Sequence, residues 1–284
     1  PMLDEIYTTE SRTAILDTLS ERVQFTGANT VNLFTLSTMG MGNYDRNAGF
    51  VPGDVNGSWQ PYVLNVDRGR SYMVDTLDND ESLGLAAGSL LSTVERQHVI
   101  PEVDAFRFSE YASNADASQI VSGTIATGAA AVAAVDAATV ALDNAEVPYE
   151  GRILFVSPAF YGLIKSGITR MVMNGDRDVS YNVDIYNDMR VISVPQGRFV
   201  TAITLAAPTA ANAAGGFSKA SGAADIDFMI VHPSAVMQVM KHYVPRLFGP
   251  QVNQEADAWK LNLRYAHGAW VLNNKKKGIY VHTA

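Results

Sequence analysis

The stretch of sequence that decides the fold is residues 78–108, DNDESLGLAAGSLLSTVERQHVIPEVDAFRF. Its apolar residues recur at spacings of three and four, which is typical of a helix with one apolar face: Leu83, Ala87, Leu90, Leu91 and Val94. Asp80 suits the positive end of such a helix, and Arg96 and His98 suit its negative end. Pro101 biases Ile100 away from the helical conformation. The pattern therefore predicts a long helix from Asp80 to His98 that packs on one side only.

On the N-terminal side of this helix, side chains alternate with the period of two that is typical of strands, over residues 31–36 and again over 62–67. Between these runs, residues 40–58 are rich in Gly, Asn and Asp, which predicts a mobile tip. The sequence thus predicts a long two-stranded arm, or extended loop, within residues 22–77.

Such a hairpin is marginally stable alone in water and needs a surface to cover it. A neighbouring subunit is the natural cover, and the alternative is a hairpin that folds back onto its own domain. If a neighbour covers it, replacing Thr30–Asp67 by a short linker is expected to leave the core of the subunit intact.

The first residues predict a separate N-terminal arm, residues 1–21, with a short helix near 10–19. Pro1 is compatible with removal of an initiator methionine, and in that case no scaffolding segment would precede it in the gene.

On the C-terminal side of the helix, helical and strand patterns alternate, which predicts an α+β or α/β arrangement over about 119–231. The expected elements are an Ala-rich helix at 119–145, a strand at 152–157, a helix at 159–165, a turn at 174–178, strands at 180–185 and 190–194, a low-complexity surface loop at 204–224, a strand at 226–231, a short helix at 234–241 and an antiparallel meander over 259–282. The meander is expected to lie on the long helix.

Composition sets limits on the class of protein. With 47% hydrophobic and 18% charged residues, the 284-residue chain is typical of a folded protein, and it lacks the run of about eighteen apolar residues that a membrane span needs. It contains no cysteine, which excludes disulfides, thiolate metal sites and cysteine nucleophiles. The five histidines are scattered, and no nucleotide-binding or hydrolase motif is present. We expect no catalytic site, no cofactor and no metal.

Charge is divided unevenly along the chain. The first 150 residues carry 7 Arg, no Lys and 21 acidic residues, whereas the remainder carries 14 basic and 8 acidic residues, so the halves have net charges of −14 and +6. This asymmetry is compatible with copies that meet acidic surface to basic surface, and equally with two solvated faces of different charge.

Three segments resemble a known family: GMGNYDRNAGFVPGDV at 40–55, DRGRSYMVD at 67–75, and an acidic turn and long helix that lead into VIPEVDAFRFS at 99–109. They resemble the extended loop and the spine helix of tailed-phage major capsid proteins, which have the Hong Kong 97 fold. The resemblance is densest over residues 22–111. It implies a peripheral domain made of 78–118 and 232–284, with an axial domain of 119–231 inserted between them.

The resemblance also implies the function. The chain would be a structural protein, not an enzyme, that assembles in the host cytoplasm as hexamers and pentamers of an icosahedral shell around double-stranded DNA, and would be part of the virion. Scaffold, portal and decoration proteins would be its partners. Because the first lysine of the chain is Lys165, the extended loop lacks the lysine with which some relatives cross-link their shells, so a non-covalent shell is expected.

The residues expected to make contact between subunits come from the arm, its tip and base, and the end of the helix: Val31, Leu33, Phe34, Asp45, Arg46, Trp59, Tyr62, Leu64, Asp67, Arg68, Glu95, Arg96, Glu102, Asp104 and Arg107. Two alternatives remain at this point. One is an encapsulin-like compartment of the same fold that holds a protein cargo, and the other is an oligomeric α/β enzyme that dimerises through the hairpin.

Overall fold

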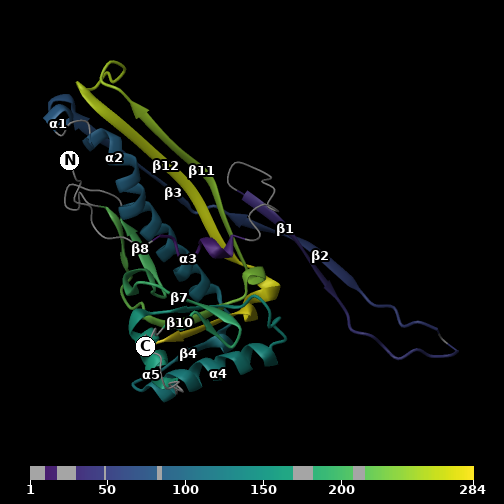
Figure 1. Cartoon of the computed structure of the whole chain (residues 1–284). Coiled ribbons are helices and arrows are strands. Elements are labelled where there is room, and N and C mark those ends of the chain that lie inside the picture. The colour runs from purple at the N-terminus through teal and green to yellow at the C-terminus, as the bar shows by residue number, and fades with distance from the viewer. Residues whose placement is uncertain (1–9, 18–29, 48, 82–84, 169–181, 207–214) are drawn as a thin grey trace.

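In the computed structural model, the structure describes residues 10–17, 30–47, 49–81, 85–168, 182–206 and 215–284. A long run of helices descends along a three-stranded sheet and ends on a six-stranded sheet, and a two-stranded hairpin projects away from both (Figure 1). Helices and sheets are thus combined as the α+β prediction required. None of the helices in the described ranges is long and apolar enough to cross a membrane.

The central helix is longer than predicted. It consists of α1 (Thr76–Glu81), α2 (Leu85–Val94), a π-helical turn η3 (Glu95–Val99) and α3 (Ile100–Asn114). The expected end at His98 is therefore wrong. In the wider π turn the Ile100 N–H donates to the carbonyl of Glu95, five residues earlier. Pro101 then occupies the first turn of α3, where its missing N–H costs little.

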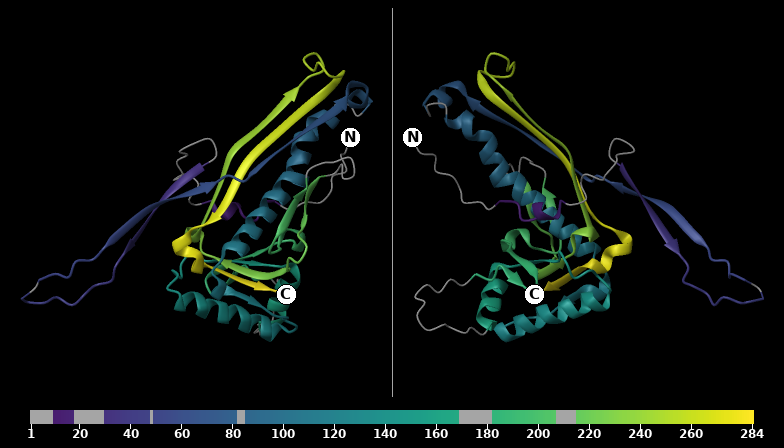
Figure 2. Two further views of the ribbon diagram at one scale, coloured as in Figure 1. Left: turned by 180° about the vertical axis from the view of Figure 1, so that it is seen from behind. Right: turned by 45° about the vertical axis from the view of Figure 1, so that its right-hand side comes forward.

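One-sided packing was predicted only for residues 80–98, and α3, which follows them, is enclosed. Every residue from Glu102 to Ser109 is buried, because α3 lies between the two sheets (Figure 2). A buried charge is costly unless it is paired or hydrogen-bonded, so the charged residues of α3 must find partners inside the subunit.

The three-stranded sheet has the order β11-β12-β3 and consists of β3 (Val66–Asp75), β11 (Val236–Phe248) and β12 (Ala258–Val271). Leu263 and Tyr265 of β12 pack on Val94, Val99 and Val103, which confirms that this strand lies on the long helix. The helix predicted at 234–241 is wrong: a short 3-10 turn, η6 (Pro233–Ala235), leads directly into β11.

The six-stranded sheet has the order β4-β13-β10-β5-β7-β6. Its strands are β4 (Ile120–Ser122), β5 (Ile153–Val156), β6 (Ile185–Tyr186), β7 (Met189–Ser193), β10 (Ile226–Val231) and β13 (Ile279–Thr283). One side forms a core with α4 (Gly128–Asn144) and α5 (Pro158–Gly167), and the other forms a core with α3.

Two expectations fail in this sheet. The helix predicted from residue 119 begins only at Gly128, capped by the Thr127 side chain, because residues 120–122 pair in parallel with β13. The predicted meander ends at β12, since η7 (Asn273–Gly278) turns the chain away and β13 pairs with β10. The division into peripheral and axial domains stays a prediction, although β13, which we assigned to the peripheral part, lies in the sheet built by 119–231.

The remaining elements are short. The chain predicted as a low-complexity loop contains the paired strands β8 (Ile203–Ala206) and β9 (Gly216–Lys219), while the turn predicted at 174–178 lies outside the described residues. Of the helix predicted near 10–19, the described part forms only a single 3-10 turn, η1 (Ala14–Leu16). Two further 3-10 turns are η4 (Ala117–Gln119) and η5 (Gln196–Arg198).

His267 gives this fold a dependence on pH. Its fully buried ring packs edge-on against Phe106 and stacks on Tyr265, and neither ring nitrogen has a hydrogen-bond partner among the described residues. Burial, with a smaller contribution from the charge of Arg107, lowers the pKa of His267 from 6.5 to about 3. Between these values the unfolded chain binds a proton that the folded chain does not.

We therefore expect the contribution of His267 to the free energy of unfolding to be complete above pH 6.5 and to fall, by up to about 1.4 kcal/mol per pH unit, as the pH drops toward 3. Urea unfolding between about pH 7 and pH 5 measures this slope. His267→Phe, which keeps the ring packing, should reduce the slope by about one proton. The matched control is His98→Gln, which replaces an exposed histidine. An unchanged slope in His267→Phe would contradict the assignment.

Candidate subunit interface

The projecting hairpin consists of β1 (Thr30–Thr38) and β2 (Val55–Val63), paired antiparallel from Thr30 opposite Val63 to Thr38 opposite Val55. Because side chains alternate across a strand, this register sorts them onto two faces. We define the inner face as Val31, Leu33, Thr35, Ser37, Asn56, Ser58, Gln60 and Tyr62. The outer face is Thr30, Asn32, Phe34, Leu36, Thr38, Val55, Gly57, Trp59, Pro61 and Val63.

The inner face attaches the hairpin to its own chain. Val31 is fully buried against Met237 and Val239 of β11, and Leu33 and Tyr62 pack at the edge of the same cluster. The ring of Tyr62 lies 5.9 Å from that of Trp270, and the side chains of Asn273 and Gln60 are hydrogen-bonded. Val31 is thus fully buried within the subunit, which contradicts its predicted contact with a neighbour. Leu33 and Tyr62 are only partly buried, and their contacts with a neighbour stay a prediction. Leu64, just after β2, is buried as well.

The outer face is apolar and open to solvent. Phe34 is 53% exposed and Trp59 is 67% exposed, and their rings pack edge to face with centroids 5.2 Å apart. The Phe34 ring also covers Gly57, where a side chain would collide with it. Leu36, Val55 and Val63 are further large exposed side chains of the outer face.

The tip beyond the paired strands continues this exposed apolar surface with Met39, Met41, Tyr44, Phe50 and Val51. Tyr44 and Phe50 pack edge to face with centroids 5.0 Å apart. Large exposed apolar side chains gathered on one projecting element are typical of surfaces that bind another protein.

The charged residues predicted at the tip have different roles. The Asp45 carboxylate accepts a hydrogen bond of 2.7 Å from the Asn47 backbone N–H, and Asp45 bridges to Gly49, so Asp45 builds the turn. Arg46 is exposed beside it. At the base, the carboxylate of Asp67 accepts a 2.9 Å hydrogen bond from Arg264 Nε, which lowers the pKa of Asp67, and both side chains are exposed.

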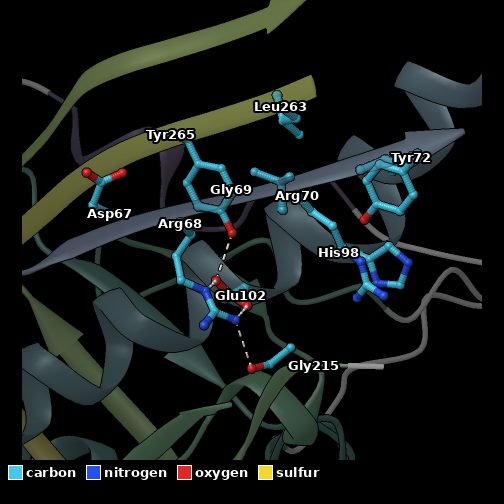
Figure 3. Close-up of a pocket in the computed structure, with 13 residues that line it drawn as sticks. Asp67, Arg68, Gly69, Arg70, Tyr72, His98, Glu102, Gly215, Leu263 and Tyr265 are labelled. Carbon is cyan, nitrogen blue, oxygen red and sulfur yellow. Dashed lines mark hydrogen bonds and ion pairs between the residues drawn. The ribbon is translucent and has the colours of Figure 1, made fainter. Parts of the chain in front are cut away.

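Arg68 and Glu102 make an internal ion pair rather than an interface (Figure 3). Arg68 donates from Nε and Nη2 to the two carboxylate oxygens of Glu102, at 2.9 and 3.0 Å. Tyr265 donates to the same carboxylate at 2.7 Å, and Arg68 also donates to the carbonyls of Ala206 and Gly216. Glu102 is buried, and burial, together with the charge of Glu102, raises the pKa of Tyr265. The predicted contact of Glu102 with a neighbouring subunit is therefore wrong.

Arg68, Glu102 and Tyr265 line a pocket of about 460 Å³ between the helix, β3 and β12 (Figure 3). Arg70, Tyr72, His98 and Leu263 also line it. Both oxygens of Glu102 already accept hydrogen bonds there. The one buried carboxylate that lines the pocket is thus engaged in the fold.

Of the other residues predicted at the end of the helix, Asp104 and Arg107 are buried inside the subunit, which contradicts a surface role. Glu95 is half-buried beside Tyr243, whose pKa is raised by burial and by the charge of Glu95, and Arg96 is exposed. Of the predicted residues, the structure therefore leaves Phe34, Trp59, Asp45, Arg46, Asp67 and Arg96 exposed and Glu95 partly exposed.

Sequence reasoning missed the contribution of Leu36, Val55, Val63 and the apolar tip residues. The pairing register is what places Leu36, Val55 and Val63 on one face with Phe34 and Trp59, and the spacing of two residues between Phe34 and Leu36 is the signal that could have found part of this face.

By sequence, the chain matches no family model and no curated protein. Its structure is similar to that of a chain from Mycobacterium phage Che8, with a TM-score of 0.69 and 13% identity, covering 99% of this chain and 94% of the other. It is also similar to the capsid structure of cyanophage P-SCSP1u, with a TM-score of 0.68, 13% identity and coverages of 100% and 90%. The mature capsid of bacteriophage PhiM1 gives a TM-score of 0.65 at 12% identity, with coverages of 100% and 90%. The chain therefore has the phage major capsid protein fold, as its resemblance implied.

Proposed function

We propose that this chain is the structural subunit of the closed, icosahedral head shell of a tailed phage, in which the outer face of each hairpin packs on a neighbouring copy. The observation that carries the proposal is the exposed apolar outer face, which projects from a subunit with a phage capsid fold (Figure 2). The role is structural rather than enzymatic.

The energetic argument favours a second copy as the cover. The inner face is already packed at its base on the chain's own β11, so the subunit holds the hairpin in place before any partner binds. The outer face then offers Phe34, Trp59 and Leu36 without the full cost of ordering a free loop. Full burial of each such side chain contributes roughly 1.5–3 kcal/mol before association costs are subtracted. In a shell these modest contacts are repeated by every copy.

Enclosure of double-stranded DNA is part of the proposal, and it separates this function from an encapsulin-like compartment with a protein cargo. The support is that the similar structures include phage capsids. Scaffold, portal and decoration proteins, implied by the resemblance, stay predictions.

We further propose that the shell is held without covalent links. The hairpin contains neither lysine nor cysteine, so it has no amine to attack a neighbour's side chain in an isopeptide and no thiol for a disulfide. Apolar burial and hydrogen bonds between copies would then provide the stability.

Assembly of the purified protein, alone or expressed with its scaffold, tests the function. We expect static light scattering and electron microscopy to find closed megadalton particles, and denaturing electrophoresis of those particles to give a single band near 30.6 kDa. Small defined oligomers under every condition would contradict the shell, whereas a ladder of covalent multimers would contradict only the non-covalent part. Packaged DNA in particles from infected cells, rather than a co-purifying protein, would support the phage-head assignment.

A further inference from the structure

A single buried carboxylate on the central helix holds the N-terminal segment. Asp104 of α3 is fully buried and accepts hydrogen bonds from Ser11 Oγ at 2.8 Å, Thr13 Oγ1 at 2.7 Å, the Arg12 backbone N–H at 2.8 Å and the Thr13 backbone N–H at 3.3 Å. Four donors from three consecutive residues thus converge on one side chain more than 90 positions away. Hydrogen bonds to an ionised group are the strong ones.

Thr13 also joins other elements to this carboxylate. Arg107 Nη1 of α3 donates to Thr13 Oγ1 at 2.9 Å, and Gln238 Nε2 of β11 donates to the Thr13 carbonyl at 2.8 Å. Arg198 Nη1, from the turn η5, lies 3.4 Å from Asp104 Oδ2. The buried Thr13 and Asp104 therefore connect the central helix to the three-stranded sheet on one side and to the 196–198 turn on the other.

The segment has little structure of its own. Its one regular element is the 3-10 turn η1, which is three residues long and lacks a side-chain cap. Its two ends are held by different contacts: residues 11–13 bind Asp104, and Leu16 is buried in the core that contains Phe106. Because these contacts are to distant parts of the chain, losing them need not disrupt either sheet.

We infer that residues 10–17, which we call the N-terminal latch, fix α3 between the two sheets and can detach while the rest of the subunit stays folded. Asp104 is the residue to which the latch binds. With the latch closed, Thr13 links α3 to β11, whereas Arg198 of η5 contacts Asp104 directly. With the latch open, α3 keeps its apolar packing and its contact with Arg198 but loses the links that run through Thr13. This inference goes beyond the proposed function, because it concerns the isolated subunit and holds whether or not shells form.

Trypsin can report on the latch, because it cleaves after Arg12 and the following residue, Thr13, is fully buried. Cleavage at this bond requires the latch to open. Thr13→Val keeps the shape and the backbone bonds but removes the hydroxyl that binds both Asp104 and Arg107, and Asp104→Asn removes the receptor charge. The matched control is Glu110→Gln, which changes a carboxylate on the same helix that accepts a hydrogen bond from Asn114, one turn away.

With the full chain under native conditions, we expect intact-mass analysis to show that Thr13→Val and Asp104→Asn each speed cleavage after Arg12 by about tenfold or more. Cleavage after Lys219 should stay at the wild-type rate, as should every site in Glu110→Gln. Equal rates after Arg12 in all four proteins would contradict the latch. So would a uniform acceleration at every site in Thr13→Val, because the segment would then unfold only with the rest of the subunit. If Asp104→Asn does not fold, Thr13→Val alone decides the question.

Discussion

Replacing residues 34–59 with a short Gly-Asn-Gly turn is expected to yield a folded subunit that no longer assembles. The excised part of the hairpin contacts solvent on its outer face and at its tip, so little of the core is lost. Closing the chain with a short turn costs on the order of a kcal/mol. We expect a cooperative thermal transition close to that of the wild type, and complete loss of megadalton particles in light scattering.

The boundaries of this replacement follow from the structure. Our initial expectation that Thr30–Asp67 can be removed without damage is contradicted, because Val31, Leu64 and Val66 are buried and Val66 and Asp67 belong to β3. The longer replacement would therefore open the core and shorten the three-stranded sheet.

Two point variants separate the faces of the hairpin. Trp59→Asp places a charge on the outer face and is expected to prevent assembly, because an unpaired charge would be buried against the neighbour. Ser58→Asp, one residue away, places the same charge on the inner face at an exposed position and should assemble normally. Assembly by Trp59→Asp, or a hairpin-shortened subunit that fails to fold, would show that the outer face is not the contact.

The second large effect is expected inside the subunit, where Glu102→Ala should lower the free energy of unfolding by about 3 kcal/mol or more. The change leaves Arg68 and the Tyr265 hydroxyl without the carboxylate that both of them bind. Glu102→Gln keeps an acceptor and should cost less, about 1–2 kcal/mol. Urea unfolding at neutral pH measures both changes.

Asp67→Ala is the matched control for this prediction. Asp67 precedes Arg68 in β3 and also pairs with an arginine, Arg264. In this pair, however, the side chains of both Asp67 and Arg264 are exposed to solvent. Exposed ion pairs contribute little to stability, so we expect almost no change. If Asp67→Ala and Glu102→Ala were equally destabilised, burial would not be the reason for the strength of the internal pair.

The parts of the fold that could be predicted from sequence are those with a strong local pattern. Alternation predicted the strands of the hairpin, and the helix predicted at 159–165 corresponds to α5. The helix beyond His98 could not be predicted, because a proline normally ends a helix and only the preceding π turn makes Pro101 acceptable.

Other errors arose where tertiary pairing decided the structure. Residues 236–240 are mostly apolar, in a short run that fits a buried helix or a buried strand, and pairing with β12 makes them a strand. Residues 120–122 precede an Ala-rich segment that favours a helix, but they form a strand because they pair with β13. Neither pairing can be deduced from local propensity.

The candidate interface was predictable only as a hairpin. The sequence analysis treated Val31, Phe34, Tyr62 and Trp59 alike, as apolar residues of the arm. In the structure Val31 and Tyr62 pack toward β11 while Phe34 and Trp59 are exposed, and this difference depends on which face of the hairpin meets β11. Similarly, nothing in the residue types of Glu102 and Asp104 says that these acidic side chains lie inside the subunit, where Arg68 and the N-terminal latch bind them.

The measurement that tests the proposed function most directly is site-specific photo-cross-linking in assembled particles. A photoreactive phenylalanine analogue would replace Trp59 on the outer face or, as the control, Ser58 on the inner face. We predict that position 59 gives covalent dimers of about twice 30.6 kDa on a denaturing gel, and that position 58 gives few or none. Particles in which position 59 cross-links only within its own chain, while position 58 reaches a neighbour, would contradict the assignment of the outer face as the contact between copies.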